Sequence, residues 1–400
     1  MLEARVKTEI SEWIVRAALA GTNEGEIVAG VCQRLSSAGV SLVRSSVATN
    51  LLDPTLDGRT VTWNRDQGAL EEAFPRTDAP ANDDWMRSPF FVLSERRQPS
   101  LRRRLDATYR RGEFPILDGF QDRGVTDYVA FAEAVSGSAR LGEGEGVVSS
   151  WTTDAAAGFS DAQVEMLAGI MPALALAFML QTTNRAARAL ITTYLGSDAA
   201  ERVLAGNIVR GRAQPIRAVV WCSDLVGFTQ ISETVGPEAV LALLNDYAEA
   251  QVEEIEAHGG HVLKFMGDGI LAIFPDEDTT RACARALDAA ANLRRRIAVL
   301  NERRRATGLP VTDTHLALHV GELLYGNLGS PRRLDFTVLG PAVNEAARIE
   351  SLCGSLEQNV IVSWAFAEAA GEARRLLVSL GRYAMKGIAR PQELFTLDRP

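Results

Sequence analysis

Apolar residues recur along the first half of the chain with both a helical period and a strand-like alternation. The helical period predicts a helix over residues 2–20, where the apolar positions are Val6, Ile10, Trp13, Ile14 and Ala17. Further helices are expected over 24–38 and from Asp161 onward, with Ser160 as the N-cap of the latter. Short strands are expected at 41–47, 61–64, 127–135 and 147–152. The stretch between 65 and 120 is rich in Pro, Arg and Asp and is expected to be irregular.

Helices, strands and a closing long helix predict an α+β domain of the sensor type over residues 1–160. In this layout, and in no specific motif, the region resembles a GAF-like or PAS-like module. Residues 96–111 carry seven arginines. These arginines could form a site for an anionic ligand or a partner, but a solvated, flexible loop is the interpretation that we favour.

Residues 161–212 are expected to form a helical connector and dimerisation segment. Leu167, Met171, Leu174 and Phe178 follow a 4-3-4 spacing, as in a short coiled-coil seam. The apolar run 166–180 is too short to cross a bilayer comfortably and contains Pro172, so we expect a buried or dimer-forming helix. Glycines and Pro215 then place a domain boundary near 210–215.

The second half of the chain alternates strongly apolar strand patterns with long helical patterns. The expected strands are 216–222, two runs around the tip 267–269, 315–328, 334–339 and short runs near 360, 378 and 394. The expected helices are 237–258, 279–307 and one that begins at Gly340-Pro341. This order is βααβ followed by a hairpin and a further helix, an α+β ferredoxin-like plan for residues 213–400.

Two aspartates stand beside glycine at the ends of predicted strands. Asp268 lies in the tip Gly267-Asp268-Gly269 of a tight hairpin, and Asp224 ends the first strand of the domain. Paired carboxylates can hold two Mg²⁺ ions, although two unrelated turn acids would give the same pattern. Lys264 lies in the hairpin strand, where it could also be a lysine that extends its amine to water.

The turn after Asp224 leads into a helix, so backbone N–H groups near Phe228 and Thr229 offer an anion site. The net charge of −9 argues against nonspecific binding to nucleic acid or to anionic membranes.

Cysteine and histidine usage narrows the chemistry further. The four cysteines are far apart and form no CxxC pair, which predicts neither a zinc site nor a disulfide framework and fits a cytoplasmic protein. The N-terminal residues alternate charged and apolar side chains, unlike a signal peptide. All four histidines lie in the second half, which excludes a histidine-ligated haem or a His-rich metal site in the first. The lone Cys32 is interpreted as a core residue.

Four ordered motifs of the second half resemble the catalytic domain of class III nucleotidyl cyclases. They are SDLVGFT, KFMGDGILAIF, HVGELLYGNLG and LDFTVLGPAVNEAARIE, and the resemblance covers about residues 213–398. It implies two Mg²⁺ or Mn²⁺ ions per active site, held by Asp224, Asp268 and the Leu225 carbonyl. It also implies a homodimer with two shared sites, in which the metal aspartates act from one chain and the nucleotide-reading residues from the other.

The resemblance assigns a role to each matching residue. Lys264 and Thr337 resemble the pair that reads adenine, whereas guanylate cyclases usually carry Glu and Cys there. Asn344 matches the residue that orients the ribose, and Arg348 matches the arginine that stabilises charge on the α-phosphate. Lys386 matches the lysine that binds the terminal phosphates.

These residues lead us to expect an adenylate cyclase that converts ATP to 3′,5′-cyclic AMP, regulated at its N-terminal domain by an unknown small molecule or protein. A guanylate cyclase remains an alternative, as does a nucleotide-binding pseudoenzyme that signals by docking. The pseudoenzyme is disfavoured because both aspartates and the arginine are present. A diguanylate cyclase shares the ferredoxin-like plan, but the chain has no GGDEF-type run.

Overall fold

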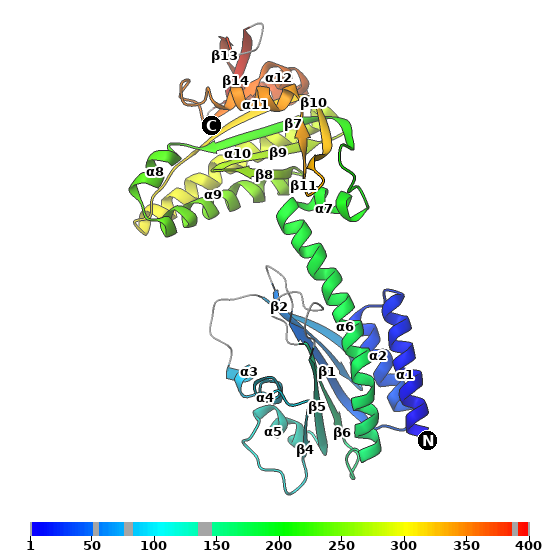
Figure 1. Ribbon diagram of the computed structural model, residues 1–400. Helices are drawn as coiled ribbons and strands as arrows, with labels where there is room; N and C mark the ends of the chain where they lie inside the picture. Colours follow the sequence, from blue (N-terminus) through cyan, green and yellow to red (C-terminus); the bar gives the residue numbers. More distant parts are fainter. Residues whose placement is uncertain (1, 51–55, 76–82, 135–145, 386–390, 399–400) are drawn as a thin grey trace. The chain divides into compact units, whose positions relative to one another are not determined.

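The computed structural model describes residues 2–50, 56–75, 83–134, 146–385 and 391–398 (Figure 1). The chain divides into two compact units, Met1–Leu190 and Ile191–Pro400. Each unit has its own sheet and its own hydrophobic core.

The N-terminal unit is built on a six-stranded antiparallel sheet in the order β3-β2-β1-β6-β5-β4. Its strands are β1 (Leu42–Asn50), β2 (Leu56–Asn64), β3 (Gly68–Pro75), β4 (Ser100–Arg104), β5 (Asp127–Ala134) and β6 (Gly146–Thr153). Its helices are α1 (Leu2–Leu19), α2 (Glu24–Ser37), α3 (Asp83–Met86), α4 (Pro89–Arg96), α5 (Pro115–Asp122) and α6 (Asp161–Leu195).

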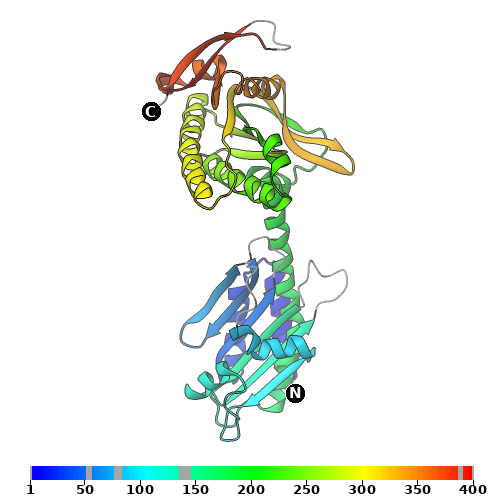
Figure 2. The same ribbon diagram turned by 90° about the vertical axis from the view of Figure 1, so that its left-hand side faces the viewer.

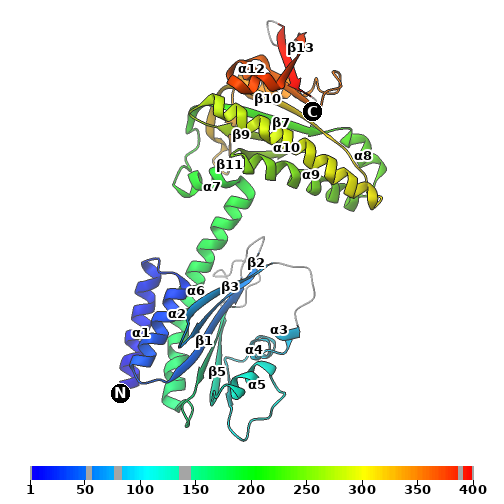
Figure 3. The same cartoon turned by 180° about the vertical axis from the view of Figure 1, so that it is seen from behind.

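The two faces of this sheet are covered by different helices (Figures 1 and 3). Alternate residues of a strand point to opposite faces, and Val47, Val129 and Trp151 are buried on the face that packs against α1, α2 and α6. On the other face, Leu117 and Phe120 of α5 pack against Tyr128 and Ala130. Figure 2 shows the sheet from the side of α3, α4 and α5.

The expectation that residues 65–120 are irregular is wrong, because β3, α3, α4, β4 and α5 all lie in this stretch. Strand β3 has the sequence GALEEAFP and is exposed along nearly its whole length, so it has no alternation of apolar and polar residues to reveal it. Strand β4 has the sequence SLRRR, in which only Leu101 is buried. Both strands lie at the edges of the sheet, where burial imposes little pattern.

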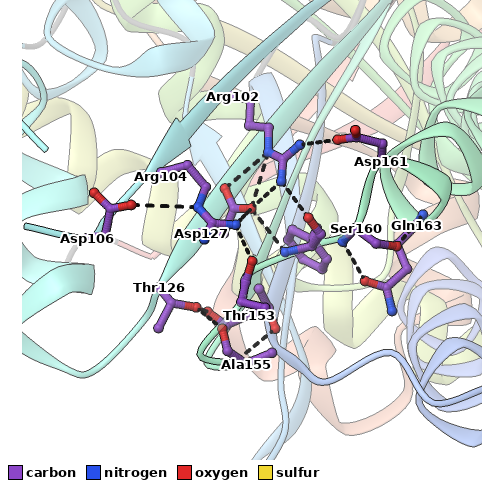
Figure 4. Close-up of polar contacts among 12 residues, drawn as sticks. Arg102, Arg104, Asp106, Thr126, Asp127, Thr153, Ala155, Ser160, Asp161 and Gln163 are labelled. Carbon is purple, nitrogen blue, oxygen red and sulfur yellow. Dashed lines mark hydrogen bonds and ion pairs between the residues drawn. The ribbon is translucent and has the colours of Figure 1, made fainter. Parts of the chain in front are cut away.

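Three of the arginines of 96–111, at positions 102–104, lie on β4 and not in the solvated, flexible loop that was expected. Arg102 lies on β4 and donates to the carboxylate of Asp127, with its Nη2 at 2.8 Å from Oδ2 (Figure 4). The Asp127 side chain is fully buried and also accepts from the backbone N–H of Phe159 at 3.0 Å. Arg102 reaches Asp161 at 3.2 Å as well, so this group ties β4 and β5 to the start of α6.

The long helix α6 begins as predicted. Ser160 Oγ accepts from the N–H of Gln163, whose side chain accepts from the N–H of Ser160, a reciprocal capping box.

Of the two alternatives expected for this helix, buried or dimer-forming, the buried one is confirmed for its first half. Its seam residues, Leu167, Met171, Leu174 and Phe178, are at most 1% exposed and lie in the core of the N-terminal unit. By length and composition α6 could also cross a membrane, and 44% of its most apolar window is buried.

The second unit is built on an eight-stranded sheet whose main path runs β13-β14-β12-β10-β7-β9-β8, with β11 paired to β10. Its strands are β7 (Ala213–Leu225), β8 (His261–Met266), β9 (Gly269–Pro275), β10 (Thr314–Ser330), β11 (Arg333–Leu339), β12 (Val360–Ser363), β13 (Leu377–Tyr383) and β14 (Gln392–Leu397). Its helices are α7 (Ser197–Leu204), α8 (Phe228–Thr234), α9 (Pro237–Ala257), α10 (Thr279–Ala306), α11 (Pro341–Glu350), α12 (Trp364–Ala369) and the 3₁₀ helix η2 (Gly371–Leu376).

Strand β7 is the central strand of this unit and is buried on both faces. Val219 and Trp221 pack toward α9 and α10, whereas Val220 and Cys222 pack toward α7 and α11. The predicted order of strands and helices in this half of the chain is confirmed, and its mixed α and β content agrees with the predicted fold class. Because β7 is held inside the sheet, the sheet also fixes the position of Asp224, the residue before the last one of this strand.

Candidate active site

Asp224 occupies the penultimate position of β7, the point at which the buried strand reaches solvent. Its neighbours Ser223 and Leu225 are buried, while Asp224 itself is half-buried. Strand β7 pairs with β10 on one side and β9 on the other, so the backbone at Asp224 is held in the middle of the sheet. A carboxylate at this point is fixed by the sheet and still open to a ligand.

Asp268 lies at the tip of the β8–β9 hairpin, as predicted. Gly267 has φ +71°, a backbone conformation that side chains other than glycine rarely adopt. Gly269 is needed for a different reason, because a Cβ there would lie 2.6 Å from the Ser223 carbonyl oxygen and 3.3 Å from Asp224 Oδ1. The absence of a side chain at Gly269 therefore lets the hairpin tip approach the end of β7.

The two carboxyl groups are close enough to share a proton. The pKa of Asp224 is raised to about 6 by burial first, and then by the hydrogen bond and negative charge of Asp268. Within the described parts of the chain, neither carboxylate forms an ion pair with an arginine or a lysine. The site thus concentrates negative charge that no cation of the described residues pairs with.

A third acid, Glu350 at the end of α11, was missed at the level of sequence. Burial first, and then the charges of Asp224 and Asp268, raise the pKa of Glu350 to about 7. Glu350 therefore lies within electrostatic range of the pair. No sequence signal marks it, since it is one of many acids on helical surfaces and its relation to Asp224 spans more than a hundred residues of chain.

Lys264 is held by an acid that was also missed. Its Nζ lies 2.5 Å from Oδ2 of Asp335 on β11, 71 residues further along the chain. A β-bulge between Val262 and Lys264 interrupts the pairing of β8 with β9 at this point. Lys264 is therefore directed to β11 rather than left as a solvated lysine. Thr337 lies two residues after Asp335 on β11 and is 4% exposed.

Asn344 and Arg348 lie one turn apart on α11, with Asn344 exposed and Arg348 half-buried. The opposite stripe of the helix packs inward through Ala342, Ala346 and Ile349. Among the described residues, neither side chain has a hydrogen-bonding or ionic partner. At 100° per residue, Arg348 is about 200° around the helix from Glu350, and so away from the Asp224–Asp268 pair of its own chain.

The remaining predicted residues fall in two places. Phe228 and Thr229 open α8, directly after Gly227, whose φ is +65°. Lys386 lies outside the described residues, so its predicted contact with the terminal phosphates stays a prediction. Within the described residues, no group of three or more His, Cys, Asp or Glu side chains could hold a metal ion.

Comparison with known proteins agrees with this arrangement. Residues 213–398 match the family model of the adenylate and guanylate cyclase catalytic domain. An adenylate cyclase of Anabaena cylindrica is 34% identical over 161 residues, which are 39% of this chain and 31% of that protein. Adenylate cyclase 1 of Rhizobium meliloti (strain 1021) is 32% identical over 189 residues, 46% of this chain and 28% of that protein.

A solved structure, the adenylyl cyclase CyaB from P. aeruginosa, is 26% identical and covers 47% of this chain and 97% of its own, with a TM-score of 0.44. The chain spans less than a third of the length of the two curated relatives, so those matches concern the catalytic domain alone. Residues 213–398 of this chain therefore form a domain that matches the family of adenylate and guanylate cyclase catalytic domains.

Proposed function

We propose that this protein is an adenylate cyclase that converts ATP to 3′,5′-cyclic AMP and pyrophosphate. The observation that supports the proposal most is the Asp224–Asp268 pair, two adjoining carboxylates without a cationic partner in the described chain. Lys264, which Asp335 directs toward β11, resembles with Thr337 the pair that reads adenine in adenylate cyclases. The similarity to two proteins named adenylate cyclases points the same way.

The carboxylate pair fits divalent cations. The raised pKa of Asp224 means that the pair resists carrying two negative charges unless a cation joins it. Two carboxylates and one backbone carbonyl, at Leu225, suit Mg²⁺ or Mn²⁺, because these ions complete their shells with water and phosphate oxygens. We propose two ions per site. When bound, they would lower the pKa of the ribose hydroxyl and offset charge on the phosphates.

The reaction joins the ribose 3′-oxygen to the α-phosphorus and breaks the bond from that phosphorus to the bridging oxygen of the β-phosphate. Pyrophosphate leaves with the bond's electron pair, and the hydroxyl proton passes to water. Positioning and charge stabilisation account for most catalysis of this kind. We assign Arg348 to the charge that develops on the α-phosphate, because its planar fork of donors suits phosphate oxygens.

Three other tasks fall to this chain's residues. Lys264 and Thr337 bind the edge of the adenine, and Asn344 orients the ribose so that the 3′-oxygen faces the phosphorus. The backbone N–H groups at Phe228 and Thr229 bind the phosphates together with Lys386. In this proposal, the aspartates bind the metal ions, and other residues on other elements bind the nucleotide.

We propose that the active sites are shared between two copies of the chain. Arg348 and Asn344 lie on the side of α11 that faces away from Glu350. Glu350 is the residue of this helix whose pKa is raised by the charges of Asp224 and Asp268. A second protomer related by a two-fold axis would place its Arg348 opposite those carboxylates and would create two sites at once. It would also exclude water from the nucleotide.

The N-terminal unit is proposed to regulate this activity, as a GAF-like or PAS-like sensor. Support comes from its separate core and from its continuity with α6, which leads into the catalytic domain.

The test is a product assay on the full-length chain with ATP or GTP and with Mg²⁺ or Mn²⁺. Cyclic AMP and pyrophosphate should form in equal amounts from ATP, and GTP should react more slowly. Asp268→Asn should lower the rate roughly a hundredfold or more, the range seen when one electrostatic contact to a transition state is removed. Asp288→Asn changes an exposed carboxylate on α10 and should leave the rate unchanged. Absence of cyclic AMP with either metal would refute the proposal.

A further inference from the structure

In the central strands of the N-terminal sheet, one face carries polar side chains and the opposite face carries apolar side chains. Ser46 on β1 stands in register with Thr62 on β2 and with Ser150 on β6. These three hydroxyl residues are only 3–9% exposed, and the Ser46 and Thr62 oxygens lie 3.3 Å apart. Adjacent residues of the three strands, Val47, Val61 and Trp151, pack in the apolar core on the opposite face.

A row of buried hydroxyls is an uncommon way to build the interior between a sheet and a helix. Burying a hydroxyl without a good partner costs free energy, and aliphatic side chains would fill the same space without that cost. The polarity is confined to the central strands, since Leu101, Ala130 and Leu117 form an ordinary apolar cluster beside it. The hydroxyls have partners within the protein, Ser46 with Thr62 and Ser150 with Tyr128, and they place further polar groups on the face that carries Arg44.

Arg44 stands one register row away on the same face, between Asn64 and Thr152. Its Nη2 donates to Thr62 Oγ1 at 3.3 Å, and its guanidinium lies 5.4 Å from the centre of the Phe120 ring. Burial lowers the pKa of this guanidinium. Within the described residues Arg44 forms no ion pair; the buried Tyr128 hydroxyl acts on its charge, and the one carboxylate that does so is Glu72, which is exposed.

A second arginine adds to the positive charge at this ring. Arg123, which follows α5, has its guanidinium 5.2 Å from the centre of the same Phe120 ring. It is exposed, and its charge acts against that of Arg44. Of the nearest acids in sequence, Asp122 binds Arg111 at 2.7 Å and Asp118 accepts from the Gly112 N–H at 3.0 Å; the charge of Arg123 also acts on Asp122, although the two form no ion pair.

We propose that Arg44 and Arg123 form a binding site for a small anion, a carboxylate or a phosphate group, on the face of the N-terminal sheet beside Phe120. Two arginines offer paired donors that match both kinds of oxyanion. The hydroxyls of Ser46 and Thr62 would bind further polar atoms of the ligand. The anion would relieve the repulsion between the two arginines. This inference concerns the sensor unit alone and does not depend on the proposed catalytic activity.

The test measures hydrogen exchange of the full-length chain by mass spectrometry in the presence of inorganic phosphate or acetate, against chloride at equal ionic strength. Saturable protection of peptides covering residues 42–50 and 115–123 is expected with at least one probe. Protection by phosphate alone identifies a phosphate site, and protection by acetate alone identifies a carboxylate site. If neither probe protects these peptides more than chloride does, the proposal is wrong.

Three variants complete the test. Arg44→Gln and Arg123→Gln should each weaken binding of the effective probe roughly tenfold or more, because each removes charge-assisted hydrogen bonds. Arg111→Gln removes an arginine from the same segment that already has a carboxylate partner, and it should leave binding unchanged. If Arg44→Gln fails to fold, the test rests on Arg123→Gln, because Arg123 is exposed. Equal binding by wild type and Arg123→Gln, or equal loss in Arg111→Gln, would overturn the proposal.

Discussion

Replacing Asp127 by alanine should loosen the N-terminal unit far more than any exposed acid of the same region. The Asp127 carboxylate is fully buried and accepts from Arg102 and from the Phe159 N–H (Figure 4). Its removal leaves a half-buried guanidinium and a buried N–H without their main acceptor. Breaking a buried pair in this way typically costs 3–5 kcal/mol, and we expect about 3 kcal/mol because Arg102 keeps Asp161 as a partner.

Hydrogen exchange of the full-length chain can measure this effect separately in each unit. A loss of about 3 kcal/mol corresponds to roughly a hundredfold faster exchange of the slowest amides in β4, β5 and the start of α6. Peptides of the second unit should not change. The matched control is Asp122→Ala, because Asp122 and its partner Arg111 are both more than half exposed. An effect below tenfold for Asp127→Ala, or an equal effect for the control, would refute this account of the Arg102–Asp127 group.

Three further predictions concern the catalytic domain. Because the folded-state pKa of Asp224 is raised from 3.8 to about 6, metal-free protein loses stability as the pH rises through that window. With a chelator present, the free energy of unfolding of Asp224→Asn should therefore be higher than that of wild type above pH 6 and equal to it below pH 4. A difference that does not change with pH would contradict this. Gly269→Ala should abolish activity, since its Cβ would meet the Ser223 carbonyl at 2.6 Å, whereas Gly236→Ala meets nothing closer than 3.8 Å and should stay active. Lys264→Glu combined with Thr337→Cys should shift the ratio of kcat/KM values toward GTP, and an unchanged ratio would remove both residues from purine recognition.

The local patterns in the sequence predicted the second unit well, because its central strands are buried and its turns depend on a few glycines. The tip Gly267-Asp268-Gly269 specifies a hairpin through local backbone geometry alone, and the structure has that hairpin. Likewise, Ser160 and Gln163 form a capping box that two residues encode. Such features need no knowledge of the rest of the fold.

Other features depend on contacts between residues far apart in the chain. The Lys264–Asp335 pair joins residues 71 apart, and the Arg102–Asp127 pair joins residues 25 apart. Neither partner is distinguished by its local sequence. The edge strands β3 and β4 were missed for a related reason, since an exposed edge requires no apolar alternation.

The seam of α6 shows how one pattern can serve two structures. An apolar 4-3-4 spacing suits a coiled coil between chains and the core of one domain equally well. In this chain Leu167 and Phe178 pack into the N-terminal core. The spacing identifies the buried face of the helix, whereas only the tertiary structure identifies what covers it.

The most direct test of the central claim, an adenylate cyclase with shared active sites, is the activity of mixed inactive variants. Asp224→Ala and Arg348→Ala should each be nearly inactive alone. In a co-expressed heterodimer, one site has the wild-type Asp224 and the wild-type Arg348, and the other site has neither. The account predicts that cyclic AMP formation returns to as much as half the wild-type rate when differently tagged subunits are co-purified. If tagged heterodimers form and wild type is active, but the mixture makes no cyclic AMP, the catalytic residues act within one chain and the shared-site account is wrong.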